Sequence, residues 1–301
     1  MIEAVNKGPN LFHLAGVVPV AGQALEFNFP WHPSLNPINK DYLALQRAVY
    51  ECAMVGCETI WVVCHMETQP LIRNVLGEWV TDPASLGRGF YQSDNVRRVP
   101  IYYVPVHPKD RQKRDSLGWS VLYGALSAYW ISKKMSKWLT PDMYYTCFPY
   151  GVYPVEFLKQ ERKKISSRKK FLLNYKGQTV KDGLPIGFTF DGEDFKNCRR
   201  SVREESTSLF DSEGNRLSIK ERYSARNFSL DKVFECVNIE DVNKVEVPWY
   251  HDISTWRGYA DCIASDKKLV KPKELKYNEW NTIRSDWHRS ESEGSDYRNE
   301  D

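Results

Sequence analysis

Three loops of the sequence hold the residues whose types could do chemistry. The loop Ala21–Pro37 opens with Gly22, where the backbone could approach a phosphate group. The loop Arg111–Gly118 is rich in basic side chains, and the loop His251–Trp256 contains the carboxylate of Asp252. Backbone amides and cations neutralise phosphates, and a carboxylate suits Mg²⁺. The residue types therefore suggest a phosphate site with a metal ion, if the fold brings the loops together.

Each of these residues also has an ordinary structural role. Gly22 could be the turn that ends a strand, and Asp252 could cap the helix that follows it. The basic residues Arg111, Lys113 and Arg114 could form a solvated surface loop. For single residues, the sequence leaves both roles open.

Apolar runs and helical spacing predict the elements that position these loops. The run Leu14–Val20 is nearly continuous, as in a parallel strand that is buried on both faces. A helix capped by Asp41 and running to about Val55 separates it from a second strand, Glu58–Cys64. This order favours a right-handed βαβ unit. Further predicted elements are a helix Gln69–Trp79, a strand Val99–Val106, a polar loop His107–Arg111, a helix from Asp115, as its cap, to Met135, and a strand Met143–Phe148.

The second half of the chain has a different texture. It begins with a predicted helix, Glu156–Lys164. The run Lys159–Lys170, which overlaps this helix, holds seven basic residues against one acid, which is typical of a solvated surface. Residues 191–228 are polar and contain glycines, so we interpret them as an insertion or a set of exposed loops. The remaining predicted elements are strands Phe171–Tyr175, Leu184–Phe190 and Val245–Tyr250, and helices from Ser229 to Val237 and from Ser254 to Ala264.

The bulk composition argues against several classes of protein. The 301 residues carry a net charge of only +3, which is too balanced to indicate a nucleic-acid binder. We expect no membrane association, because no apolar run approaches the length of a membrane span and the N-terminus lacks a signal-peptide pattern. The seven cysteines are scattered and lack a zinc-like spacing, so we expect reduced thiols in a cytoplasmic protein.

The order of these features resembles that of the sugar-phosphate nucleotidylyltransferases. Pro19–Gly22, the long loop and Leu35–Ile38 before a helix look like the opening of that family. The pair Leu117-Gly118 resembles the family's next nucleotide-contacting turn. Trp249–Thr255, with the sequence WYHDIST, resembles its closing Trp-x-Asp-Ile-Gly-Thr segment. The matching segments span about residues 12–265.

The resemblance implies a fold, a division of the chain and a set of site residues. The fold is α/β, a three-layer α/β/α Rossmann-like nucleotide-diphospho-sugar transferase fold with a mixed central sheet. A lead-in (1–10) precedes one domain (11–265), which has a nucleotide-binding half (11–153) and an acceptor half (154–265) with the insertion. We expect the charged tail (266–301) to be disordered. Ala21, Gly22, Gln23, Leu117 and Gly118 would bind the nucleotide, Asp252 would hold Mg²⁺ as a catalytic metal ligand, and Arg114 would contact the triphosphate in catalysis.

The sequence departs from the family pattern at its charged positions. The first loop lacks the family's second glycine and its arginine, and Glu26 lies near where a cation would be. The family's Pro-Lys pair is replaced around His32–Ser34. The strand that carries the family's Gly-Asp metal ligand ends at Phe148–Gly151 without a carboxylate. The basic residues before Gly118 could replace the missing cations.

Two functions from different classes follow. In the first, the protein is an enzyme, a divergent nucleotidyltransferase that moves a nucleoside monophosphate from a nucleoside triphosphate to a sugar phosphate or a similar acceptor. In the second, it is a catalytically inactive relative that keeps the fold as a nucleotide-binding or assembly module, with a protein partner or as a homo-oligomer. The missing charges favour the second, because each preorganised charge is worth about two to three orders of magnitude in rate. The chain also looks like nucleotidyltransferase-like proteins of tailed phages.

Overall fold

The computed structural model describes residues 12–22, 27, 29–86, 97–218, 222, 224 and 228–272. The expectations for the lead-in, for Gln23 and Glu26, and for most of the charged tail lie outside these residues. Within the described ranges, no helix is long and apolar enough to cross a membrane.

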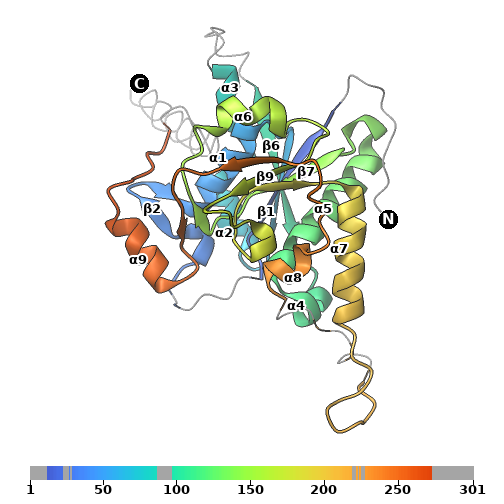
Figure 1. Cartoon of the computed structure of the whole chain (residues 1–301). Helices are drawn as coiled ribbons and strands as arrows, with labels where there is room; N and C mark the ends of the chain where they lie inside the picture. The colour runs from blue at the N-terminus through green and yellow to red at the C-terminus, as the bar shows by residue number, and fades with distance from the viewer. Residues whose placement is uncertain are drawn as a thin grey trace, which may run out of the picture.

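A mixed sheet forms the centre of the fold (Figure 1). In the described part of the chain its eight strands are, from edge to edge, β11 (Asn243–Glu246), β9 (Phe171–Asn174), β10 (Phe188–Phe190), β7 (Met143–Thr146), β1 (Leu14–Pro19), β4 (Thr59–Cys64), β6 (Arg98–Pro105) and β5 (Trp79–Thr81). Strand β1 is parallel to both of its neighbours, and β6 is parallel to β4. Strands β10 and β5 are antiparallel to β7 and β6.

Helices cover both faces of this sheet. One face carries α1 (Ala44–Val55), α2 (Gln69–Leu76) and α6 (Leu158–Ile165), and the other carries α5 (Leu117–Met135), α7 (Gly192–Glu205) and α8 (Leu230–Phe234). Successive side chains of a strand point to opposite faces, so Leu14 and Val18 of β1 pack in one core and Ala15 and Val17 in the other. The predicted three-layer α/β/α fold with a mixed central sheet is confirmed.

Short elements lie around the sheet. Strand β2 (Pro37–Asn39) pairs with β3 (Tyr42–Leu43), and β8 (Gly151–Val152) pairs with β12 (His251–Asp252). The short helices are α3 (Pro83–Leu86), α4 (Pro108–Arg114) and α9 (Trp256–Ala264).

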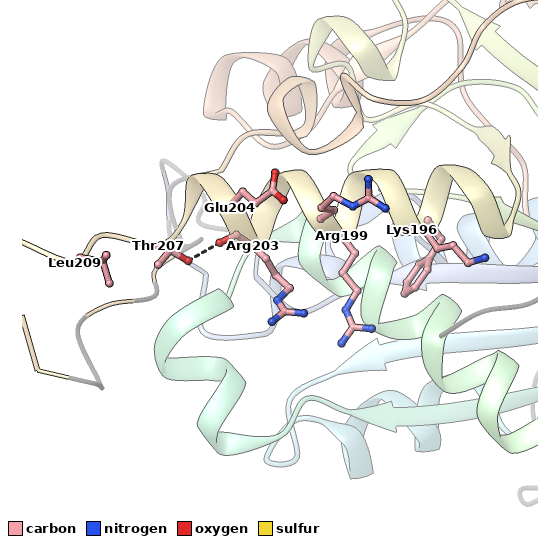
Figure 2. A pocket seen from close by; sticks show the side chains of 8 residues that line it. Lys196, Arg199, Arg203, Glu204, Thr207 and Leu209 are labelled. Atoms are coloured by element: carbon pink, nitrogen blue, oxygen red, sulfur yellow. Dashed lines mark hydrogen bonds between the residues drawn. The ribbon is translucent and has the colours of Figure 1, made fainter.

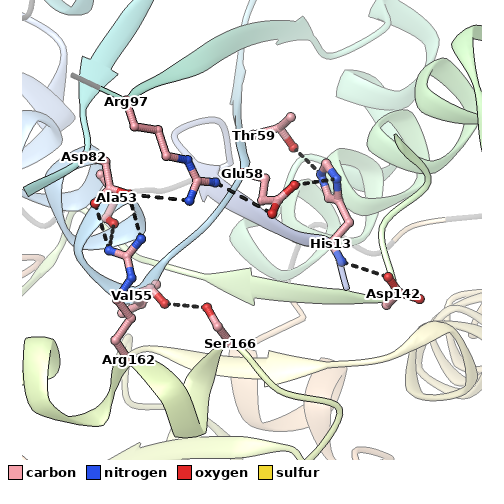
Figure 3. Close-up of polar contacts among 10 residues, drawn as sticks. All are labelled: His13, Ala53, Val55, Glu58, Thr59, Asp82, Arg97, Asp142, Arg162 and Ser166. Carbon is pink, nitrogen blue, oxygen red and sulfur yellow. Dashed lines mark hydrogen bonds and ion pairs between the residues drawn. The ribbon is translucent and has the colours of Figure 1, made fainter. Parts of the chain in front are cut away.

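Polar contacts join the strands where β1, β4 and β7 begin (Figure 3). The backbone N–H of His13 donates to Asp142 Oδ2 at 2.8 Å, and His13 Nε2 lies 3.1 Å from Thr59 Oγ1. Glu58 lies 3.7 Å from Arg97 in an ion pair. These contacts hold the starts of the strands in place. Open α/β sheets bind ligands at the opposite, carboxyl ends of their strands, so a ligand site is expected there.

Arg162 of α6 joins three segments of the chain (Figure 3). Its guanidinium donates two bonds to the carboxylate of Asp82, of 2.9 and 2.7 Å. It also donates to the carbonyl oxygens of Ala53 and Met54 in the last turn of α1. Helix C-termini leave such carbonyls without partners. Within the basic run Lys159–Lys170, this side chain therefore has a structural role instead of forming part of a solvated face.

Helix α7 replaces the first part of the predicted insertion. Asp191 caps it, because its side chain accepts two backbone N–H groups of the first turn. Phe195, Cys198 and Val202 recur at helical spacing and are each 1% exposed. The prediction of exposed loops is therefore wrong for residues 192–205, and the insertion stays a prediction. The many charges of this segment hid a helix that needs only a narrow apolar stripe.

Two predicted helix caps, one predicted loop and one predicted helix end are also wrong. Asp41 adopts a φ of 58° in the turn between β2 and β3, and α1 begins only at Ala44. Ser116, and not Asp115, caps α5 with its side chain. Helix α4 replaces the polar loop expected after His107, and β5 includes the position at which the second helix was expected to end.

Candidate functional site

The loop after β1 meets the start of α5 at the carboxyl end of the sheet. Gly22 has a φ of 82°, and a Cβ atom placed on it would lie 2.4 Å from the carbonyl carbon of Ser116. Only a residue without a side chain fits this contact without a shift of the backbone. Ser120 Oγ donates a bond of 3.0 Å to the carbonyl oxygen of Ala21. The fold thus brings two of the three predicted loops together, with Ala21 and Gly22 at the junction.

Leu117 and Gly118 lie in the interior. Leu117 is 7% exposed, and a Cβ atom on Gly118 would lie 2.7 Å from Val233 Cγ2 in α8. Gly118 therefore allows α5 and α8 to pack closely. The nucleotide contact expected for both residues stays a prediction, to which the structure adds this packing role.

Asp252 lies opposite Gly151, where β12 pairs with β8. Its Oδ1 accepts the backbone N–H of Ser254 at 2.9 Å. The helix-capping role that the sequence left open for Asp252 is wrong, because α9 begins at Trp256 and Thr255 caps it by accepting the backbone N–H of Gly258. Gly151 belongs to the segment in which the family pattern would place a second carboxylate. The third predicted loop therefore lies beside the segment that follows β7. Of the two paired positions, Asp252 and Gly151, only Asp252 carries a carboxylate.

Asp252 could hold a metal ion only together with a bound ligand that supplies further oxygen atoms. In the ranges that the structure describes, no three His, Cys, Asp or Glu side chains gather so that they could hold a metal ion. Mg²⁺ often binds through one or two carboxylates and completes its shell with phosphate oxygens and water. Asp252 fits that mode, in which the phosphates of a substrate supply the other ligands.

The basic residues before α5 contact other side chains. Arg111 Nη1 donates a bond of 2.6 Å to Glu67 Oε1. The guanidinium carbon of Arg114 lies 4.8 Å from the centre of the Trp119 ring, and its Nη1 lies 3.6 Å from Asp110 Oδ1. The contact expected between Arg114 and a triphosphate stays a prediction.

Two histidines that the sequence did not indicate as partners lie near each other. His65 follows β4, and its Nε2 lies 3.0 Å from Asp115 Oδ1. Burial, and to a smaller extent the charge of His65, lower the pKa of His32 to about 4. His32 is therefore neutral at pH 7, with its Nδ1 2.9 Å from Ser34 Oγ. No local pattern could link His65 to Asp115, because 50 positions separate them.

A buried ion pair holds the end of β7. Arg47 and Glu51 on α1 are both 0% exposed, and their charged atoms are 2.7 Å apart. Glu51 Oε1 accepts bonds of 2.5 and 2.6 Å from the hydroxyls of Tyr145 and Tyr153. Arg47 Nη2 donates a bond of 2.8 Å to the carbonyl oxygen of Phe148. The network thereby fixes the turn that leads into β8.

Aromatic rings join the loop after β1 to α9. Phe29 stacks on Trp31 with ring centres 4.7 Å apart, and Phe27 contacts Trp256 edge-on at 5.5 Å. Phe29 also lies 6.3 Å from Trp256. Helix α9 follows Asp252 closely in the chain, so this aromatic cluster connects the Asp252 segment with the loop that begins at Gly22.

Solved structures share this architecture. A Bacillus anthracis protein, provisionally named a glucose-1-phosphate thymidylyltransferase and solved with sucrose, aligns with a TM-score of 0.51. The alignment covers 87% of this chain and 98% of that one, at 12% identity. The chain has the fold of the sugar-phosphate nucleotidylyltransferases.

A UDP-glucose pyrophosphorylase in its apo form supports the nucleotidylyltransferase fold. It aligns with a TM-score of 0.50 over 84% of this chain and 97% of its own length, at 11% identity. No protein-family model and no curated protein matches the sequence. The resemblance stated from the sequence is therefore confirmed at the level of the fold, and the function must be argued from the site.

Proposed function

We propose that the protein is a divergent nucleotidyltransferase that acts in the cytoplasm. It would bind a nucleoside triphosphate at the loop around Gly22. An oxygen of the acceptor, a sugar phosphate or a similar phosphorylated compound, would attack the α-phosphorus. The bond between the α-phosphorus and the bridging oxygen to the β-phosphate would break, which releases pyrophosphate.

One observation carries this proposal, namely the contact between Gly22 and the first turn of α5. It lies at the carboxyl ends of parallel strands, where α/β sheets bind ligands, and at a helix N-terminus, which favours anions. Ala21 and Gln23 would extend this phosphate loop, and Leu117 with Gly118 would shape the floor of the pocket. Arg114 would contribute positive charge.

Asp252 is the residue that would hold Mg²⁺. When bound, the ion would neutralise phosphate charge and polarise the phosphoryl oxygens. The half-buried carboxylate keeps one oxygen on the backbone N–H of Ser254, which orients the other. The residue opposite, Gly151, adds no second ligand, so the proposal assigns the remaining ligands to substrate phosphates and water.

The small number of charges at the site favours a second function. A site with one carboxylate, and with Arg111 paired with Glu67, has less charge to stabilise a transition state. Such a protein could bind a nucleotide without turning it over and serve as a binding or assembly module. A protein partner or a second copy of the chain would then supply its biological role.

A nucleotide screen tests whether a triphosphate binds. Thermal unfolding is measured with each nucleoside triphosphate, with and without Mg²⁺. We expect at least one triphosphate to raise the Tm, since a ligand at about a hundred times its Kd adds about 2.7 kcal/mol of stability. Asp252→Asn should remove the Mg²⁺ dependence of this rise. Asp261→Asn, an exposed aspartate on α9, is the matched control and should behave as the wild type.

Pyrophosphate release separates the two functions. The triphosphate found in the screen is incubated with a panel of sugar phosphates, and pyrophosphate is measured. Release that depends on the acceptor supports the enzyme. Stabilisation by a triphosphate without release supports the binding module. If no triphosphate raises the Tm, both proposals fail.

A further inference from the structure

One face of α7 carries basic side chains that the proposed function does not use (Figure 2). Lys196, Arg199, Arg200 and Arg203 lie at positions i, i+3, i+4 and i+7, so they share one side of the helix. This basic row lies next to the buried apolar stripe of the same helix. At a rise of 1.5 Å per residue, the row is about 10 Å long.

The basic row lines a pocket of about 1040 Å³. Among its described lining residues, Glu204 is the single acid. In the described ranges, none of the four basic side chains of the row forms an ion pair with an acid. Lys170 of the neighbouring basic run, by contrast, lies 2.7 Å from Asp194. The four basic side chains of the row therefore outnumber the acids near them, which are Glu204 in the lining and Asp110, whose charge acts on Arg199.

Arg114 of α4, whose charge acts on Arg199, and Trp119 of α5, over whose ring Arg114 lies, are outside the described lining of the pocket. Burial, followed by the charges of Arg203 and Arg114, lowers the pKa of Arg199, which places the three guanidinium groups in one electrostatic neighbourhood. The Nε atoms of Arg114 and Arg199 and the indole Nε1 of Trp119 are buried without a hydrogen-bond partner among the described residues. Trp119 is only 5% exposed, and Arg114 lies over its ring. Buried donors are almost always bonded in proteins, so an anion that reached Arg199 in the pocket would supply an acceptor to a side chain whose Nε has no partner among the described residues.

We propose that the pocket on α7 binds an anion with two or more linked phosphate groups. Phosphate oxygens are strong acceptors, and guanidinium groups bind them through paired N–H donors. A basic row about 10 Å long suits a short chain of phosphates better than a single phosphate. The row covers only about two turns of one helix, which favours a small anion over a nucleic acid, whose phosphates would extend beyond the row. The phosphates can be free or can be the tail of a nucleotide.

The pocket has a different lining from the proposed nucleotide site, although Arg114, which that site would use, also acts on Arg199. Its described lining comes from α7 and from the residues that follow it, Thr207 and Leu209, and includes neither Gly22 nor Asp252. The proposal therefore does not depend on the nucleotidyltransferase reaction. A protein that failed every turnover assay would still bind the anion here.

Calorimetric titration of the full chain with inorganic tripolyphosphate, without Mg²⁺, tests the proposal. We expect tripolyphosphate to bind more tightly than orthophosphate and to weaken as salt is added. Arg199→Gln with Arg203→Gln should weaken the binding of tripolyphosphate by at least about tenfold per arginine, the size of one charge-assisted hydrogen bond. Titration with ATP tests whether the linked phosphates belong to a free oligophosphate or to a nucleotide. Equal affinity supports a nucleotide tail as the ligand, and weaker affinity supports a free oligophosphate.

Three further variants serve as an alternative to the Arg199 variant and as controls. Arg200→Gln with Arg203→Gln removes two exposed charges and should fold even if the Arg199 variant does not. Lys159→Gln with Lys163→Gln removes the same charge from the exposed face of α6 and should leave the affinity unchanged. Asp252→Asn should also leave the affinity for tripolyphosphate unchanged.

Four results would overturn the proposal. They are no binding of tripolyphosphate by the wild type, unchanged binding in both arginine variants, an equal loss in the α6 control, and tighter binding of a single-stranded oligonucleotide than of tripolyphosphate.

Discussion

Replacement of Glu51 by glutamine should destabilise the protein by about 3–5 kcal/mol. The carboxylate is 0% exposed and accepts bonds from Arg47, Tyr145 and Tyr153. Burial is the largest single effect and disfavours the charged guanidinium, but Glu51, together with smaller contributions from Cys147, Tyr153 and Tyr42, holds the pKa of Arg47 above its ordinary value. Glutamine keeps the shape and removes the charge. The buried guanidinium then loses the partner that makes its burial tolerable.

A double-mutant cycle in urea measures this effect. The free energy of unfolding is determined for Glu51→Gln, Arg47→Met, Glu51→Leu and the Arg47→Met, Glu51→Leu pair. We expect the pair to lose less stability than the sum of its single changes, since no charge remains buried without a partner. Glu235→Gln, an exposed change on the surface, should stay within about 0.5 kcal/mol of the wild type.

Two outcomes would refute the reasoning about this pair. One is a Glu51→Gln protein within about 1 kcal/mol of the wild type, because a buried charge without a partner cannot cost so little. The other is a double variant that loses as much as its two single changes together. The same double variant removes the donor to the carbonyl of Phe148, so its triphosphate binding reports on how that turn supports the site.

Single contacts lead to three more expectations. Gly118→Ala should cost about 1–3 kcal/mol in urea unfolding because the methyl group meets Val233, and Val233→Ala should restore part of the loss; a Gly118→Ala protein of full stability would contradict this contact. Gly22→Ala forces a side chain against Ser116 at a φ of 82°, so it should cost about 1–3 kcal/mol and abolish stabilisation by a triphosphate; retained stabilisation would argue against a phosphate loop here. The pKa of His32 is lowered from 6.5 to about 4, so the unfolded chain takes up this proton first and stability should fall as pH drops from 6.5 towards 4. His32→Gln should flatten that part of the curve of stability against pH, and an unchanged slope would count against the shift.

Strands that are buried on both faces could be predicted from the sequence. The apolar runs of β1, β4 and β7 were placed to within a few residues, because a fully buried parallel strand has a nearly continuous apolar sequence. Helix α7 was missed for the opposite reason. Its surface is charged on most sides, and only Phe195, Cys198 and Val202 mark its buried face. A short edge strand such as β5, with three residues, leaves even less pattern in the sequence.

Contacts between distant positions depend on the fold and are absent from local patterns. The sequence indicated Gly22 and Asp252 as candidates, and the loop before α5 as their companion. It could not indicate that Gly22 touches the backbone of Ser116, or that Asp252 pairs with Gly151. Register and helix packing decide these contacts, and both arise only when the sheet has formed.

The segment after β11 returns to the first loop of the chain. Tyr259 donates from its hydroxyl to the carbonyl oxygen of Pro37 at 3.0 Å, and Asn39 Nδ2 donates to the carbonyl oxygen of Leu269 at 2.6 Å. A ribosome must therefore release residues 251–269 before the loop after β1 has its aromatic partners. The same residues must be released before β12, which contains Asp252, can pair with β8. The strands from β1 to β10 are synthesised earlier and can pair first. During that interval the proposed triphosphate site is incomplete, so its ligand cannot stabilise the nascent N-terminal half, which must fold on its hydrophobic core alone.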